Sequence, residues 1–244
     1  MKKLLSVLVA CVLLCTLMGG CSGKKKVTLV MATEAGFRPY EYYEGEEVVG
    51  VDVDIAREIA AEMGAELVIE NMEFGSIIPA VKSGKADFGA AGISISEERA
   101  TQVDFTIEYA TSKQVILTVE GSDIMVDTDL DGKTVGVQLG TVADLALEED
   151  YPNVTLQQYN KYFEAAGDLL AGRIDAIVLD ALPAAEIAKM DPSLVIREKE
   201  LFTDVYAFCV QKDNTELLET INKVMQRLLD EGKIEEYTAA HSAD

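Results

Sequence analysis

The feature that most constrains the fold is an alternation of strand-like and helix-like hydrophobic patterns that runs through the chain twice. Between residues 27 and 92, short apolar runs alternate with segments whose apolar residues recur every three or four positions, which predicts the order βαβαβ. The same order recurs between residues 133 and 180. Alternation of this kind favours a largely parallel sheet with helices on both faces, so the sequence predicts two similar α/β lobes.

A short internal echo supports this repeat. Residues 83–88 (SGKADF) and 171–176 (AGRIDA) each combine a helix stop, a basic residue and an aspartate that leads into an apolar strand. The expected strands are 27–32, 66–70, 86–92, 133–139, 154–159 and 174–180. The expected helices are 52–64, with Gly64 as its C-terminal cap, 75–82, 141–150 and 161–172.

Two extended segments join the two halves and predict a hinge. Residues 110–118 lead away from the first half and residues 204–210 lead back, and the amphipathic helix at 215–232 then completes the first lobe. The expected domains are lobe 1, formed by 27–110 and 207–244, and lobe 2, formed by 111–206, with hinge crossings near 110–116 and 204–209.

The first twenty residues predict an export signal rather than part of the fold. Lys2 and Lys3 precede an apolar run at 4–17, too short to span a bilayer comfortably, and the run ends in MGGC at 18–21. This tetrapeptide resembles a lipobox, with methionine where leucine is usual, and implies a lipid anchor on Cys21. Residues 21–26 are then the lipidated cysteine and a basic tether. The alternative is an ordinary signal peptide that leaves Cys21 free, and in both cases the protein is extracytoplasmic.

Charge and composition exclude several classes of function. The chain of 244 residues has 43 acidic and 21 basic residues and a formal net charge of -22, which argues against a nucleic-acid partner because phosphates are neutralised by Lys and Arg. No Ser-His-Asp set, paired-cysteine metal site or P-loop is present, so no catalytic residue, metal or cofactor is expected. Beyond Cys21 only Cys209 remains, and its apolar surroundings predict a buried thiol.

The chemistry is expected where the strands end, because ligands of open α/β sheets bind beyond the carboxyl ends of strands. One such stretch is AAGISISEER at 90–99. In it, Gly92 lets a ligand approach the backbone, Ser94 offers a hydroxyl, and Arg99 offers a planar fork suited to a carboxylate. Ser96 is expected to cap the helix that follows. The plain structural alternative is that Arg99 pairs with neighbouring glutamates.

Six stretches, taken in order, resemble the family 3 extracellular solute-binding proteins, the polar amino-acid receptors of ABC importers. The resemblance covers residues 27–237, and its stretches are ATEAGFRPYEYY, VVGVDVDIAREIAAEMG, FGSIIPAVKSGKADFGAAGISISEERATQVDFT, GKTVGVQLGTVADL, GRIDAIVLD and NTELLETINKVMQRLLDEGKIEEY. It implies a type II periplasmic-binding-protein-like fold, with two lobes, each a mixed, mostly parallel sheet flanked by helices, and a two-segment hinge. It also implies a monomer that closes on a free amino acid and delivers it to a membrane permease.

The resemblance also implies roles for individual residues. Arg99 would bind the ligand α-carboxylate, with Gly92 and Ser94 contacting the carboxylate and the amino group, and Asp180 would bind the α-ammonium. The other implied contacts are aromatic walls at Phe37 and Phe74, a helix N-terminus at Gly140 and Thr141, and side-chain selectors at Glu34 and Gln138. Asp180 is also expected to cap the helix that follows it.

Departures from the family pattern leave the ligand class open. Val142 replaces a common threonine or glycine, Ala91 replaces a serine of some basic amino-acid binders, and Leu179 adds no polar group. Glu34 favours a cationic side chain and Gln138 a neutral one, so a polar neutral or a basic amino acid is expected. Two other functions stay open: a secreted cyclohexadienyl dehydratase with Glu34 or Asp180 as its acid, and a tethered amino-acid sensor. Outside the site, Tyr40, Tyr42 and Tyr43 are expected at the surface and His241 in a frayed tail.

Overall fold

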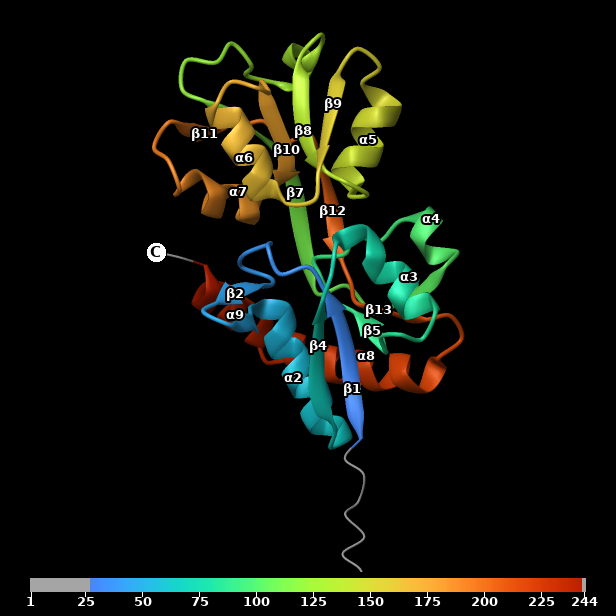
Figure 1. The fold of residues 1–244 in the computed structure, drawn as a ribbon. Coiled ribbons are helices and arrows are strands. Elements are labelled where there is room, and N and C mark those ends of the chain that lie inside the picture. The colour runs from blue at the N-terminus through green and yellow to red at the C-terminus, as the bar shows by residue number, and fades with distance from the viewer. Residues whose placement is uncertain (1–26, 243–244) are drawn as a thin grey trace, which may run out of the picture.

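The structure is a computed structural model that describes residues 27–242, and it has two lobes. Figure 1 shows one lobe above the other, each a β-sheet flanked by helices, with strands β7 and β12 running between them. The two-lobed α/β architecture confirms the fold expected from the sequence. The predicted signal peptide, the lipidation site Cys21 and the basic tether lie outside the described residues.

The first lobe is built on a five-stranded sheet in the order β4-β1-β5-β13-β6. Strand β1 is parallel to both β4 and β5, whereas β13 is antiparallel to β5 and β6. The strands are β1 Thr28–Thr33, β4 Glu66–Asn71, β5 Phe88–Gly89, β6 Val103–Phe105 and β13 Cys209–Gln211. A hairpin of β2 Tyr42–Glu44 and β3 Glu47–Val49 lies beside this sheet. The helices of the first lobe are α2 Val51–Met63, η1 Phe74–Ser76, α3 Ile77–Lys82, α4 Glu97–Ala100, α8 Thr215–Asp230 and α9 Lys233–His241.

The second lobe is built on a six-stranded sheet whose central path is β11-β7-β10-β8-β9, with β12 also paired to β7. Strand β8 is parallel to β10 and β9, and β7 is antiparallel to its partners. The strands are β7 Ala110–Val119, β8 Thr134–Gln138, β9 Thr155–Tyr159, β10 Ala176–Asp180, β11 Leu194–Ile196 and β12 Phe202–Tyr206. The helices are η2 Asp127–Leu130, α5 Val142–Asp150, α6 Tyr162–Leu170 and α7 Ala181–Ala188.

The echo found in the sequence is also a structural repeat. Val30 N–H donates to Asp87 Oδ2 at 2.7 Å, and Thr134 N–H donates to Asp175 Oδ2, also at 2.7 Å. In both lobes the aspartate also donates its own N–H back to the neighbouring strand, to Val30 and Thr134 respectively. Each aspartate therefore ties the start of a strand to its parallel neighbour, which fixes the register of the two sheets in the same way.

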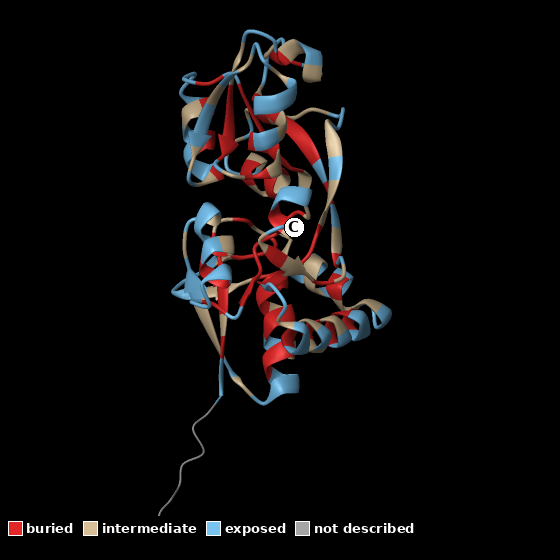
Figure 2. Cartoon of the chain, turned by 90° about the vertical axis from the view of Figure 1, so that its right-hand side faces the viewer, coloured by how far each residue is buried: buried red, intermediate tan, exposed pale blue. Residues whose placement is uncertain are grey.

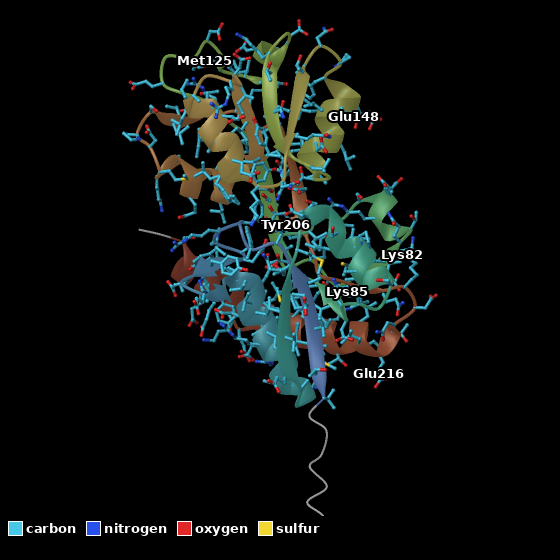
Figure 3. All side chains as sticks on the ribbon, viewed as in Figure 1. Lys82, Lys85, Met125, Glu148, Tyr206 and Glu216 are labelled. Carbon is cyan, nitrogen blue, oxygen red and sulfur yellow. The ribbon has the colours of Figure 1, made fainter. Side chains whose placement is uncertain are left out.

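Two paired strands connect the lobes. Residues Ala110–Gln114 of β7 pair antiparallel with Phe202–Tyr206 of β12. Strand β7 continues into the second sheet, whereas the chain leaves β12 to enter β13 of the first sheet. Figure 3 shows Tyr206 where the two lobes meet. Of the two segments predicted to be extended, residues 110–118 lie within β7, and residues 204–210 run from the end of β12 to the start of β13.

The predictions for two residues outside the sheets were wrong. Tyr40 is only 2% exposed, because the chain turns back between Phe37 and Glu41 and directs this ring toward Tyr206, with ring centroids 5.0 Å apart. His241 is not frayed: it ends α9, with Nε2 lying 2.9 Å from Asp54 and Nδ1 lying 3.1 Å from the Tyr42 hydroxyl. Both residues join segments that are distant in the sequence.

The expected strand at 86–92 is also shorter than predicted. Only Phe88 and Gly89 form β5, and the chain leaves the sheet at Ala90. Gly92 has a positive φ of 52°, and its N–H is bound by the side chain of Asp52 at 3.0 Å. This conformation favours glycine and cannot continue a strand, so residues 90–94 become a loop at the edge of the cleft.

Burial explains why helix α8 belongs to the first lobe. Its inward face buries Leu217, Ile221, Val224, Met225 and Leu228, and Asn214 caps its N-terminus by accepting a hydrogen bond from Leu217 N–H. Figure 2 shows buried residues concentrated on the strands and inward helix faces, with the outer helix faces exposed. The amphipathic pattern of α8 therefore serves packing rather than a surface interaction.

We predict that Ile221→Ala lowers the free energy of unfolding by about 2–5 kcal/mol, because the fully buried side chain leaves a cavity in lobe 1. Urea unfolding monitored by circular dichroism measures the change. Glu219→Ala, on the exposed side of the same helix, is the control and should change stability by less than about 0.5 kcal/mol. Equal effects of the two substitutions would contradict the packing assigned to α8.

Candidate ligand-binding site

A small cavity lies between the lobes, where β1, β5, β8 and β10 end. The residues that line it are Glu34, Phe37, Glu41, Phe74, Ala91, Gly92, Ser94, Arg99, Gln138, Thr141, Val142 and Asp180. Nine of the ten site residues expected from the sequence are among them, and the tenth, Gly140, lies directly beside the cavity as a partner of Arg99.

Arg99 is a buried cation without a carboxylate partner among residues 27–242. It is 6% exposed, and its guanidinium donates to two backbone carbonyls, Ser94 O at 2.6 Å and Gly140 O at 2.9 Å. The guanidinium carbon also lies 5.3 Å from the centre of the Phe74 ring. Burial lowers the pKa of Arg99, but a guanidinium stays protonated. The alternative that Arg99 merely pairs with a neighbouring glutamate on its helix is therefore wrong for this structure.

Asp180 provides the opposite charge from the other lobe. Ser112, Gln114 and Tyr206 all donate hydrogen bonds to its Oδ1. Its other oxygen accepts no hydrogen bond from the described residues, and the side chain lines the cavity. Burial raises the pKa of Asp180 to about 6, with a further contribution from the nearby Asp204. The expected capping bond to α7 is absent, because the side chain is held by these donors instead.

Glu34 and Gln138 meet across the lobes at another part of the cavity. Gln138 Nε2 donates to Glu34 Oε2 at 3.2 Å and to the carbonyl of Asn160 at 2.8 Å. Lys161 Nζ lies 3.5 Å from the other carboxylate oxygen of Glu34. Burial raises the pKa of Glu34, and the contacts with Gln138 and Lys161 oppose this rise. This end of the cavity therefore has an acidic group with both a neutral and a cationic neighbour.

The aromatic residues form one wall of the cavity. Phe37 is 7% exposed and stacks against Tyr40 and Tyr162, with ring centroids 5.8 and 6.2 Å apart. Phe74 is half-buried and lies under the Arg99 guanidinium. Gly92 lies directly against Phe37, since an added Cβ would lie 2.7 Å from Phe37 Cε1. The glycine therefore determines where this ring can lie.

Several small groups expected to contact a ligand already have protein partners. Gly92 N–H donates to Asp52, and the Ser94 hydroxyl donates to Asp204 on β12. Gly140 N–H donates to Asp144 at 2.8 Å, and Thr141 is the N-cap of α5 while its hydroxyl donates to Gln138 O. Ser96 caps α4 as expected. In this structure these groups position the loops around the cavity.

Glu41 is a cavity residue that sequence reasoning missed. It is fully buried, and neither of its oxygens accepts a hydrogen bond from the described residues. Burial and the adjacent Asp52 raise the pKa of Glu41 well above its usual range, which favours its protonated form. No local pattern in the sequence marks Glu41, which lies among tyrosines expected at the surface. Asp52 in turn accepts from Tyr109 at 2.6 Å.

A larger hollow of about 600 Å³ lies between α9, α7 and the start of β7. Its lining includes Glu108 and Glu235 but no lysine or arginine, so it offers no partner for a carboxylate. The smaller cavity has buried groups of both charges, and chemistry rather than size makes it the candidate site. Among residues 27–242, no cluster of His, Cys, Asp or Glu suits a metal ion, and no helix is long and apolar enough to span a membrane.

Two lobes that enclose a small cavity with buried charges of opposite sign define a protein that binds a small solute. Residues 29–242 match the bacterial extracellular solute-binding proteins, family 3. The arginine-binding extracellular protein ArtP of Bacillus subtilis (strain 168) is 34% identical over 222 residues, 89% of this chain and 86% of that protein. ABC transporter arginine-binding protein 1 of Escherichia coli (strain K12) is 30% identical over 238 residues, 95% of each chain.

Solved structures agree with this assignment. An ancestral arginine-binding protein bound to arginine has a TM-score of 0.84 and 35% identity, covering 89% of this chain and 99% of that chain. A structure described as an ancestral arginine-binding protein bound to glutamine has a TM-score of 0.84 and 34% identity, covering 90% and 99%. The chain belongs to the bacterial extracellular solute-binding proteins of family 3. It is thus a binding protein and not an enzyme.

We predict that ionisation of Asp180 destabilises the ligand-free protein. Its pKa rises from 3.8 to about 6 on folding, so the native state binds more protons than the unfolded state between these pH values. Stability should therefore fall with rising pH by up to about 1.4 kcal/mol per unit in this window and then level off.

The measurement is urea unfolding between pH 4 and pH 8 for the wild type and Asp180→Asn. The variant keeps an oxygen at this position but does not titrate, so the difference between the two curves isolates Asp180 from Glu41 and Asp52. Parallel curves would show that the Asp180 pKa is not raised.

Proposed function

We propose that this protein captures a free α-amino acid with a cationic side chain, with arginine as the first candidate, and delivers it to an ABC permease in the membrane. The observation that carries the proposal is the buried guanidinium of Arg99, which has no carboxylate partner in residues 27–242 and shares a cavity with Asp180. A zwitterion would place its α-carboxylate on Arg99 and its α-ammonium on Asp180, and each pair gains strength where water is excluded.

The acidic side of the cavity supports a cationic side chain. Glu34, Glu41 and Asp180 line it, whereas Arg99 is the only basic residue of the lining. Asp180 would pair with the α-ammonium, and burial beside Asp52 favours the protonated form of Glu41, so Glu34 is left for the ligand side chain. Named relatives point the same way, since the proteins from Bacillus subtilis and Escherichia coli are described as arginine-binding. The remaining site residues Phe37, Phe74, Gly92, Ser94, Gln138, Gly140 and Thr141 would shape the cavity around the ligand.

Hinge closure supplies the mechanism in this proposal. The ligand contacts come from both lobes, so the ligand has all its partners only when the lobes are closed, and binding shifts the population toward the closed form. The hinge crossings would lie near 110–116 and 204–209, where β7 and β12 connect the lobes. A permease that recognises the closed form would then accept only loaded protein. We further propose that the protein acts as a monomer and is held at the outer face of the membrane by lipid on Cys21.

We predict that Arg99→Ala weakens binding of every α-amino acid by about a hundredfold or more, because it removes a buried partner of a group that all of them share. Isothermal titration calorimetry with L-arginine, after refolding to remove bound ligand, measures the loss. Arg99→Lys should restore part of the affinity, since it retains the charge but not the planar fork.

The control is Arg57→Ala, which removes an arginine whose side chain is 50% exposed in the same lobe and should leave affinity unchanged. Thermal unfolding checks that each variant is folded. If folded Arg99→Ala binds arginine as tightly as the wild type, the carboxylate has another partner and the proposed site is wrong.

A further inference from the structure

Glu34, which lines one end of the cavity, already has a cationic partner in the protein itself, behind the cavity lining. Lys161 precedes α6 in the second lobe, and Glu34 follows β1 in the first. Their ion pair, with 3.5 Å between Nζ and Oε1, therefore crosses from one lobe to the other. It occupies the carboxylate that the proposed function assigns to a ligand side chain.

The two oxygens of Glu34 are not equivalent. Oε2 accepts a hydrogen bond from Gln138, whose amide is itself fixed by the carbonyl of Asn160. Oε1 accepts no hydrogen bond from the described residues and has only the longer ion pair with Lys161. A buried carboxylate oxygen with such a loose partner is the acceptor that an incoming donor can take.

The partners also differ in how easily they move. The side chain of Glu34 is 3% exposed, whereas that of Lys161 is 25% exposed and reaches solvent. Its ammonium also lies 5.9 Å from the centre of the Phe163 ring, whose residue is 50% exposed, so the cation has a favourable contact on its solvent side as well. Lys161 can therefore withdraw from Glu34, whereas Glu34 stays in the cavity.

We propose that Lys161 is a specificity-determining residue, a built-in cation that neutralises Glu34 for ligands with a neutral side chain and is displaced by ligands with a cationic one. This inference rests on the proposed function. With Lys161 in place, the pair carries no net charge and accepts an amide or ureido group. A guanidinium in the same place would put two cations beside one carboxylate in a site of low dielectric, so Lys161 must withdraw.

The test compares L-arginine with L-citrulline, which have nearly the same shape but differ by one charge at the side-chain end. In Lys161→Met, arginine affinity should rise about tenfold, equivalent to about 1.4 kcal/mol, while citrulline affinity should change by less than about threefold. Isothermal titration calorimetry on ligand-free protein measures both. Lys161→Arg keeps the cation and should retain the wild-type ratio of the two affinities.

Two further variants separate this effect from general electrostatics. Lys133→Met removes a lysine of the same lobe that is similarly buried, at 28% exposed, but pairs with Asp123 at 3.0 Å outside the cavity, so it should leave the ratio unchanged. In a Glu34→Gln background, Lys161→Met should no longer favour arginine, because the competition is for the Glu34 carboxylate. Lys161→Gln replaces Lys161→Met if the latter fails to unfold cooperatively.

Two results would overturn the inference. An unchanged arginine-to-citrulline ratio in folded Lys161→Met would show that Lys161 does not select between ligands. A loss of affinity for both amino acids by the same factor would show that the pair only holds the lobes together. Failure of the wild type to bind either amino acid would overturn the proposed function as well, which distinguishes the two failures.

Discussion

The arrangement of the cleft depends on one buried cation. Arg99 lies in the first lobe, but one of its two carbonyl partners, Gly140, belongs to the second. A guanidinium removed from water and held by two carbonyls and an aromatic ring is incompletely compensated, because neither kind of group replaces a counter-ion. An anion bound between the lobes would therefore stabilise Arg99. The turns at 90–99 and 138–142 hold the guanidinium where it lines the cavity.

Asp180, which carries the opposite charge, is held by hydrogen bonds from side chains rather than from the backbone. Asp180 receives three hydrogen bonds on one oxygen from β7 and β12, the strands that connect the lobes. These donors orient the carboxyl, yet burial still raises its pKa to about 6. An ammonium group that enters the cavity favours the ionised form, so ligand binding and proton release at Asp180 are linked. The strands that join the lobes therefore also position the Asp180 carboxyl in the site.

Local sequence patterns predicted much of the fold but not the contacts inside the cleft. The helical period of 51–63, the glycine cap at Gly64 and the repeated aspartates Asp87 and Asp175 are local signals, and the structure confirms them as a helix, a cap and matched strand starts. Glu41 and Lys161 carry no such signal. Their environments arise when segments from different lobes or distant turns meet, and no spacing in a single sequence encodes that proximity.

The pairing between β7 and β12 has a mechanical consequence. Five residues of each strand are joined along Ala110–Gln114 and Phe202–Tyr206. Two unpaired connectors would let the lobes twist and slide independently, whereas a hydrogen-bonded ribbon resists shear and bends as a unit. In the proposed closure, such a ribbon would limit the relative motion of the lobes to bending about the paired strands, so Arg99 and Asp180 would return to the same alignment each time the lobes close.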